Sequence, residues 1–379
     1  MSEYQYYEFK AVDRPLDRTA QEALRSISSR ARITATSFTN HYEWGDFRGD
    51  PRKLVEQWFD LHLYLANWGA RRLMMRLPAR LLNQERLAPF LQAVDWVEVW
   101  MAGDNLIIDI YQDEEDAHEY VEDEPDRLAT LAPLRDDLLS GDLRLFYLLW
   151  LTAVQHQLIA DEEVEPLPGI GPLTGPLESF GAFFEVDPDL MQAAAEGEYE
   201  AAAVSREDLS RTLAAMPEHE KVELLLRVVD GDALVGAELR RGAREKSPSQ
   251  TPCRTAGDLQ GRARDIAEAR ERAEAERREA ARRSQAEAAE KVRRARLAAL
   301  DQRGLSVWLE IEDEIERRNA YGYDRATSLL LDLRDLAAES GSQGEFDRRL
   351  TSIRARHEKK GKFIERLARI GRDDDQGGA

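Results

Sequence analysis

The first part of the chain alternates between strand-like and helix-like patterns of apolar residues. Apolar and polar side chains alternate over residues 4–12 and again over 34–43, as they do in half-buried strands. Residues 61–66 and 71–77 are apolar runs of strand length, and Asn67-Trp68-Gly69 supplies a turn between them. We predict a strand at each of these places.

A further strand pair is indicated at residues 96–101 and 106–111. The tripeptide Gly103-Asp104-Asn105 between them is typical of a tight hairpin turn. On the first of these strands the side chains alternate, so that Val97, Val99 and Met101 share one face while Trp96, Glu98 and Trp100 share the other. Both faces are expected to be covered, one of them by helices.

Helices are interspersed with these strands. Residues 20–27 have helical spacing, and Asp50-Pro51 has the N-cap and first-turn proline that begin a helix. Six of the seven tryptophans lie within residues 1–150, which marks this part as the main aromatic-packed domain. The mixture predicts an α+β fold class with an N-terminal mixed α/β sandwich, for which a ferredoxin-like arrangement is one candidate.

Beyond residue 112 the pattern is mainly helical. Residues 113–126 are dominated by Asp and Glu, and residues 161–176 are broken by proline and glycine, so both are predicted to be linkers. Ser205 and Asp208 have the spacing of a capping box. One helix is predicted between the two linkers, at residues 138–159. Further helices are predicted after them, at residues 177–184, 188–195, from 205 onward and at 218–229.

From residue 258 to about 300 the sequence is almost wholly Ala, Arg and Glu, which predicts one long exposed helix. Four amphipathic stretches follow and predict a small helical bundle. The expected division begins with an α+β domain over residues 1–112 and an acidic and helical connector with a Pro/Gly linker over residues 113–176. A helical domain over residues 177–242, the long charged helix over 243–303 and the C-terminal bundle over 304–371 are expected to follow.

The charge of the chain is strongly and unevenly acidic. The 379 residues carry a net charge of −20, and residues 1–242 hold 46 acidic against 23 basic side chains. Residues 243–300 hold 10 acidic against 15 basic side chains. Because an acidic body repels phosphate backbones, nucleic-acid binding is disfavoured everywhere except in this middle segment.

Cysteine usage and the apolar runs indicate the compartment. Cys253 is the single cysteine, which excludes an internal disulfide and a cysteine-built zinc site and fits a reducing environment. Residues 1–7 have neither the charged nor the apolar region of a signal peptide. No apolar run approaches the roughly 20 residues that a membrane helix needs. We expect a cytoplasmic protein that makes no membrane contact.

No catalytic motif is recognisable in the sequence. A serine elbow and an HExxH zinc motif are both absent, and Cys253 lies in a polar stretch where no base is held. The glycine-rich residues 169–175 contain Pro172, which has no backbone N–H, and no predicted strand precedes them. They are therefore predicted to form a linker rather than a phosphate loop. Asp116, His118 and Glu119 could together bind calcium or magnesium. Acidic loops of this kind are usually exposed to solvent without binding a cation. We predict no cofactor, no bound metal and no catalytic residue.

Aromatic, glycine and arginine residues gather in two short segments, 41–48 and 67–72. Tryptophan and arginine dominate binding surfaces and also suit stacking on a base or a peptide. The predicted binding residues are Trp44, Asp46, Arg48, Trp68, Arg71 and Arg72. The alternative is that Trp44 and Trp68 fill the edge of the sandwich while the glycines serve turns.

The helical half carries segments at residues 183–190, 216–227, 323–336 and 354–360 that resemble the C-terminal regions of bacterial SWIM zinc-finger proteins. Residues 3–9, together with the Trp44 and Trp68 segments, resemble the N-terminal domain of bacterial proteins that carry such a tail. The cysteines and histidine of the zinc finger are absent here, so zinc is not implied. The resemblance implies a bacterial, cytoplasmic, non-catalytic assembly role.

These observations favour a protein-interaction or scaffold component of a bacterial cytoplasmic assembly, with a protein as its partner. The first alternative is a nucleic-acid-associated protein that uses the arginines of residues 258–300 with the aromatic and arginine surface. Glutamates interleave with those arginines and favour a spacer helix or an arm for a partner. The second alternative is a carboxylate- and metal-dependent enzyme.

Overall fold

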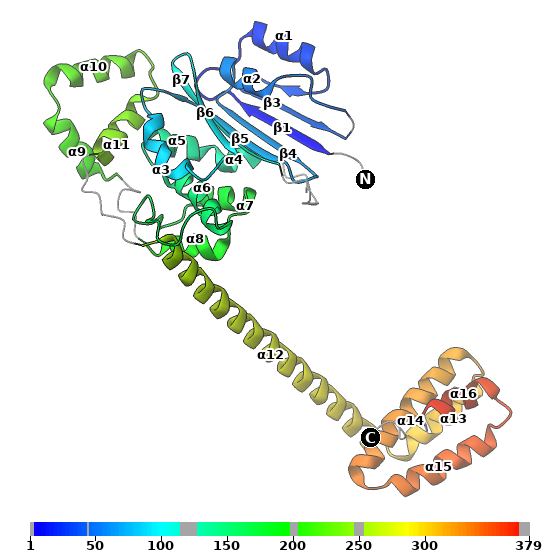
Figure 1. The fold of residues 1–379 in the computed structure, drawn as a ribbon. Helices are drawn as coiled ribbons and strands as arrows, with labels where there is room; N and C mark the ends of the chain where they lie inside the picture. Colours follow the sequence, from blue (N-terminus) through cyan, green and yellow to red (C-terminus); the bar gives the residue numbers. More distant parts are fainter. Residues whose placement is uncertain (1–3, 44, 114–126, 198–203, 246–253, 371–379) are drawn as a thin grey trace. The chain divides into compact units, whose positions relative to one another are not determined.

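The computed structural model describes residues 4–43, 45–113, 127–197, 204–245 and 254–370. The chain forms two compact units, Met1–Arg270 and Glu271–Ala379. Each unit has its own hydrophobic core, and helix α12 (Ala256–Arg303) contributes residues to both. Figure 1 shows the order of the elements along the chain.

The first unit is built on a seven-stranded antiparallel sheet with the order β2-β3-β1-β4-β5-β7-β6. Tight turns form where the sequence predicts them, with four residues between β4 and β5 and two between β6 and β7, and Gly69 and Gly103 have the positive φ that such turns favour. The strands are β1 (Gln5–Lys10), β2 (Arg32–Ile33), β3 (Ser37–Tyr42), β4 (Leu61–Ala66), β5 (Arg71–Pro78), β6 (Val97–Ala102) and β7 (Asn105–Gln112).

Two helices cover one face of this sheet (Figure 1). They are α1 (Arg18–Ile27) and α2 (Pro51–Gln57), and Asp50 caps α2 by accepting hydrogen bonds from two backbone amides, as the sequence predicts. Tyr64, Met74 and Ile107 point to this face, while their neighbours Leu63, Leu73 and Ile108 point to the other. The alternation explains why the strands carry apolar residues on both faces.

The second face is covered by several helices and a 3-10 turn. Every residue of α6 from Arg144 to Val154 is buried, as expected for a helix that is apolar all round. This layer consists of η1 (Gln84–Leu87), α3 (Ala88–Leu91), α4 (Arg127–Leu131), α5 (Pro133–Leu139), α6 (Arg144–Gln155), α7 (Gly175–Phe183) and α8 (Pro188–Ala195).

The predicted α+β class and the long helix are confirmed, and several details differ. The helix predicted over residues 138–159 is two helices, because the chain breaks after Gly141, whose φ is +80°. The elements β1-α1-β2-β3-α2-β4 with the sheet order β2-β3-β1-β4 have the ferredoxin-like arrangement, the candidate named from the sequence, and β5, β7 and β6 continue this sheet beyond β4. β2, η1 and α3 were not predicted, because each has at most four residues, and α11 (Val235–Glu245) was not predicted either.

The proline- and glycine-rich segment of residues 161–176 is irregular, as predicted, but it packs against the body. Ile170 is fully buried, and its amide donates to Ala194 O at 3.2 Å. The buried Arg144 donates to Pro172 O at 2.7 Å and to the carboxylate of Asp142. The other predicted linker, 113–126, lies outside the described residues apart from Asp113.

Three helices extend the first unit beyond α8: α9 (Arg206–Ala215), α10 (Glu218–Val229) and α11. The predicted capping box is present, since Ser205 Oγ accepts from the Asp208 amide and Asp208 accepts from the Ser205 amide. Val235 and Ala243 of α11 are buried. α11 therefore anchors this group of helices.

The second unit contains the remainder of α12 and four helices, which form the predicted bundle. Their apolar stripes meet in a core that includes Val307, Ile311, Leu330 and Phe363. The helices are α13 (Leu305–Glu316), α14 (Ala320–Ser340), α15 (Gln343–Arg356) and α16 (Gly361–Ile370). None of the described helices in either unit is both long enough and apolar enough to span a bilayer.

Candidate functional site

The first segment of predicted binding residues is mostly exposed. Trp44 lies outside the described residues. Asp46 is exposed and accepts a long hydrogen bond, 3.4 Å, from Gln5 Nε2, and Arg48 is exposed as well. Trp68, which belongs to the second segment, is half-buried in the β4–β5 turn and packs against the core beneath α1 and α2.

The two arginines of the second segment point to opposite faces of the sheet. Arg71 is buried and donates to Phe183 O at 3.0 Å and to the carboxylate of Glu185. Arg72 donates to Asp109 Oδ1 at 2.7 Å and lies 5.2 Å from the ring of Tyr111. They do not meet in one surface, because neighbouring residues of a strand alternate in direction.

An aromatic and arginine cluster does exist, but on different residues. The buried Asp109 also accepts from Arg52 Nε at 3.0 Å, and Arg52 lies 4.9 Å above the ring of Trp100. The same guanidinium bonds Glu98 and holds the pKa of its carboxylate below the ordinary range. Alternation on β6 and β7 shows which of these residues share a face, but the sequence does not show that α2 brings Arg52 to them.

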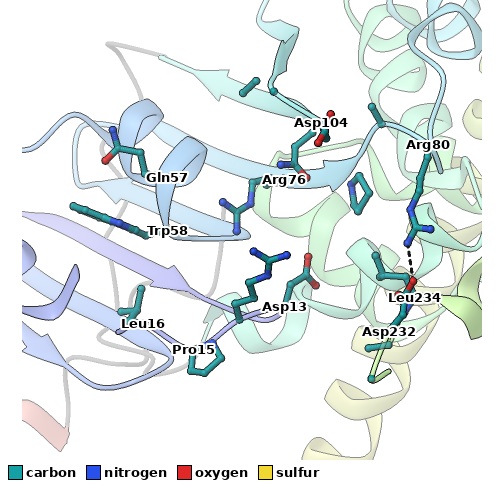
Figure 2. A pocket seen from close by; sticks show the side chains of 18 of the residues that line it. Asp13, Pro15, Leu16, Gln57, Trp58, Arg76, Arg80, Asp104, Asp232 and Leu234 are labelled. Atoms are coloured by element: carbon teal, nitrogen blue, oxygen red, sulfur yellow. Dashed lines mark hydrogen bonds and ion pairs between the residues drawn. The ribbon is translucent and has the colours of Figure 1, made fainter. Parts of the chain in front are cut away.

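A cleft of about 1110 Å³ opens at the end of the sheet where β5 finishes and β7 begins. Figure 2 shows Trp58 and Leu16 on one side of it and Arg80 with Asp232 on the other. It is lined by the loop after β1, the end of α2, the β6–β7 turn and the α10–α11 loop. Segments that are distant in sequence thus build one concavity.

The floor of the cleft is held by buried ion pairs. Arg76 donates to Asp60 Oδ1 at 2.7 Å, and the other oxygen of Asp60 accepts from the backbone amides of Val12 and Asp13. Arg135 donates to Asp13 Oδ2 at 2.6 Å and to Arg76 O at 2.9 Å. These contacts fix the loop after β1, since buried charges are stable only when paired and hydrogen-bonded.

The side chains that line the cleft are mainly charged, amide-bearing or apolar. They include five Asp and three Arg residues, Gln57, Asn105 and Trp58, and among the described lining residues there is no Ser, Thr, Cys, His or Lys. The Asp carboxylates are the groups of this lining that acid–base or covalent chemistry uses. Across the residues that the structure describes, no group of three His, Cys, Asp or Glu side chains is placed to hold a metal ion. Asp116, His118, Glu119 and Cys253 lie outside those residues.

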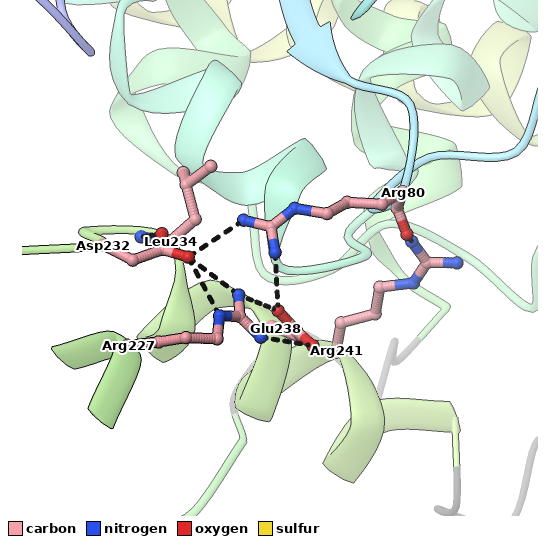
Figure 3. A network of polar contacts seen from close by, with 6 residues as sticks. All are labelled: Arg80, Arg227, Asp232, Leu234, Glu238 and Arg241. Atoms are coloured by element: carbon pink, nitrogen blue, oxygen red, sulfur yellow. Dashed lines mark hydrogen bonds and ion pairs between the residues drawn. The ribbon is translucent and has the colours of Figure 1, made fainter. Parts of the chain in front are cut away.

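An ion-pair network fixes the α10–α11 loop against the cleft (Figure 3). Arg227 donates to Asp232 at 2.8 Å and to Glu238 at 2.7 Å, and Arg80 reaches both carboxylates at 3.3 Å. The Leu234 amide and these arginines lower the pKa of Asp232, and the two carboxylates raise the pKa of Arg227. Arg241 donates to Arg80 O at 3.4 Å. α10 is thereby held in one orientation.

α10 carries five large aliphatic side chains in solvent, and four of them, Val222, Leu225, Leu226 and Val229, lie on the side of the helix away from Leu224. Val229 is 83% exposed and Leu225 is 64% exposed, and no residue of α10 is buried. The partly buried positions are Lys221, Leu224 and Arg227, which follow one another every three residues. The exposed set, called the α10 face below, consists of Val222, Leu225, Leu226, Val228 and Val229.

The apolar content of residues 222–229 indicates this surface, although their helical periodicity does not. Residues 222–229 read VELLLRVV, which holds more apolar residues than one face of a short helix can bury. Large exposed apolar groups of this kind mark interaction sites in folded proteins.

His62 is a buried titratable group that belongs to the core. Its Nδ1 lies 3.0 Å from Glu8 O, and its ring stacks on Phe9 with 3.9 Å between centroids. Among the described residues Nε2 has no partner, and burial lowers the pKa of the imidazole to about 3. His62 is fully buried and lines none of the three described cavities, and its contacts are those of a core residue.

No protein-family model matches the chain, and no curated protein or solved structure is significantly similar to it. A fold alone would not determine function in any case. The function must be inferred from the geometry of the cleft, the α10 face and the sheet.

Proposed function

We propose that this protein is a protein-interaction component and that the α10 face is its docking surface. The observation that carries the proposal is a helix with five aliphatic side chains in solvent, held outward by the network of Arg80, Arg227, Asp232 and Glu238. Fully burying one such side chain contributes about 1.5–3 kcal/mol, so covering this face would supply substantial binding energy.

The spacing of the exposed residues fits an amphipathic helix as the partner. Val222, Leu225 and Val229 recur at intervals of three and four residues, which forms a stripe that a second helix can cover. The exposed Glu223 and Asp230 flank this stripe, and the chain as a whole carries −20. The partner helix is therefore expected to carry Lys or Arg beside its apolar face.

The nucleic-acid alternative is less well supported by the contacts of α12. Arg278, Arg283 and Arg294 each bond a glutamate on the same helix, which cancels much of their field. An electrophoretic shift assay at low salt tests this alternative, because phosphate-driven binding is strongest there. The similarity of the helical half to SWIM zinc-finger proteins stays a prediction.

The proposal is tested by affinity purification of the full chain from lysate of the source organism, followed by quantitative mass spectrometry. The variant Leu225→Glu/Leu226→Glu places charge in the middle of the α10 face. Val292→Glu is the control, since Val292 is an exposed aliphatic residue, 68%, on α12. A stoichiometric partner should be lost at least about tenfold with the double variant and retained with the control.

Both substituted leucines are exposed, so neither change should unfold the protein, and circular dichroism checks this. The proposal fails if no stoichiometric partner is recovered, or if the double variant recovers the same partner as fully as the unmodified chain.

A further inference from the structure

The two edges of the sheet differ in their protection. The edge strand β2 is only two residues long, and short edge strands are one way in which proteins prevent unwanted pairing. At the other edge, β6 has six residues without lysine or proline, in unbroken register with β7. β6 pairs with no other described strand. Within the described part of the chain, one edge of the sheet is therefore protected and the other is open.

The outward backbone groups of β6 belong to Val97, Val99 and Met101. The Tyr111 amide donates to Trp96 O at 3.0 Å, which fixes the phase of the β6–β7 ladder. Because bonded pairs alternate along an antiparallel ladder, every second residue turns its amide group away from β7. Among the described residues, one side chain bonds this edge: Gln84 Nε2 lies 3.4 Å from Val99 O.

We propose that this edge pairs with the β6 edge of a second copy of the chain, antiparallel and with a two-fold axis at Val99. Val99 then lies opposite Val99 of the second copy, and Val97 lies opposite Met101 of the second copy. All outward amide groups of the three residues become paired once Gln84 moves aside, as a self-complementary two-fold interface requires. The three apolar side chains of each copy also join into one strip.

The charges beside β6 fit the same register. Glu98 lies 2.9 Å from Arg52, whose guanidinium covers the ring of Trp100. With the axis at Val99, Glu98 of each copy lies opposite Trp100 of the other and approaches the Arg52 above it. An axis at Glu98 would instead place two carboxylates directly opposite each other, which destabilises a strand pair. The charge pattern therefore selects one register and favours a second copy over an unrelated strand.

The net charge of −20 on each copy opposes association at long range. Salt screens this repulsion, so the pairing should tighten as ionic strength rises. An interface formed with an oppositely charged foreign partner would weaken under the same change.

Sedimentation velocity of the full chain over a concentration series tests the pairing. The unmodified chain should form a dimer, and Val99→Pro should be monomeric, because proline removes an outward N–H and is tolerated at sheet edges. Met101→Lys introduces the residue that natural edges use and should weaken association at least about tenfold. Val292→Lys, at another exposed aliphatic position, should leave the dimer unchanged.

A disulfide provides a second measurement that does not depend on proline. In a Cys253→Ser chain, Val99→Cys should form a covalent dimer on mild oxidation, because residues opposite each other in a bonded pair lie about 5.5 Å apart at Cα. Tyr111→Cys, on the inner strand β7, should not.

A chain that stays monomeric at every concentration and salt would overturn the pairing. So would a dimer that Val99→Pro leaves intact, or a foreign strand bound at β6 in place of a second copy. None of these results involves α10, so this inference and the proposed function can fail separately.

Discussion

The helices α6 and α10 each have twelve residues and both carry large aliphatic side chains, but their surroundings are opposite. α6 reads RLFYLLWLTAVQ, and the sheet with α3, α7 and α8 buries it almost completely. α10 reads EHEKVELLLRVV, and its aliphatic side chains lie in solvent. Burial stabilises a folded chain in proportion to the apolar area removed from water. α6 obtains this stabilisation within the fold, whereas α10 leaves it available for binding.

The largest expected difference between the two helices is in stability. Leu149→Ala in α6 should reduce the free energy of unfolding by about 2–5 kcal/mol, because the fully buried side chain leaves a cavity. The same substitution at Leu225 in α10 should change it by about 0.5 kcal/mol or less, since that side chain is exposed. Urea unfolding of both variants measures this difference. A large loss of unfolding free energy in Leu225→Ala would show that α10 is covered within the folded unit. That result would contradict the contrast between α6 and α10.

The elements that support this comparison were largely predictable, because local signals place them. Gly103-Asp104 predicts the β6–β7 turn, and Asp50-Pro51 predicts the start of α2. The break between α5 and α6 was missed, since Gly141 is a single residue within a long apolar stretch and its positive φ is not visible in the periodicity.

A second expected effect of burial concerns pH and arises at His62, in the core of the first unit. Burial lowers the pKa of His62 from 6.5 to about 3. Between these pH values His62 is protonated in the unfolded chain and neutral in the folded chain. Above pH 6.5 this difference has no effect on the free energy of unfolding. As the pH falls from 6.5 toward 3, the free energy of unfolding decreases by about 1.4 kcal/mol for each pH unit. His62→Asn should remove one proton from the pH slope of urea unfolding. Equal slopes for His62→Asn and the unmodified chain would contradict this assignment.

A smaller effect is expected where α10 is attached. Arg227→Met removes the bonds to Asp232 and Glu238, which are partly exposed, so the loss should be about 1 kcal/mol, or about fivefold in amide protection of α10. Hydrogen exchange measures it, with Arg211→Met on α9 as the control. Unchanged protection of α10 in Arg227→Met would show that this network does not orient the helix.

The candidate site was less predictable than the fold, for a physical reason. Helical periodicity identified residues 218–229, but exposure depends on which other elements reach the helix, and that is a tertiary property. The same limit applies to Arg71 and Arg72, whose partners Glu185 and Asp109 are distant in sequence. Composition identified arginine and tryptophan as residues of a binding surface, yet the Arg52–Trp100 pair was not among the predicted residues.

Site-specific photo-crosslinking in living cells tests most directly whether the α10 face is covered during function. A photoreactive amino acid at position 226 should give one discrete adduct with a partner protein, and the same group at position 292 should give none. Absence of an adduct at 226, or equal labelling at both positions, would contradict the account of α10 as a docking helix.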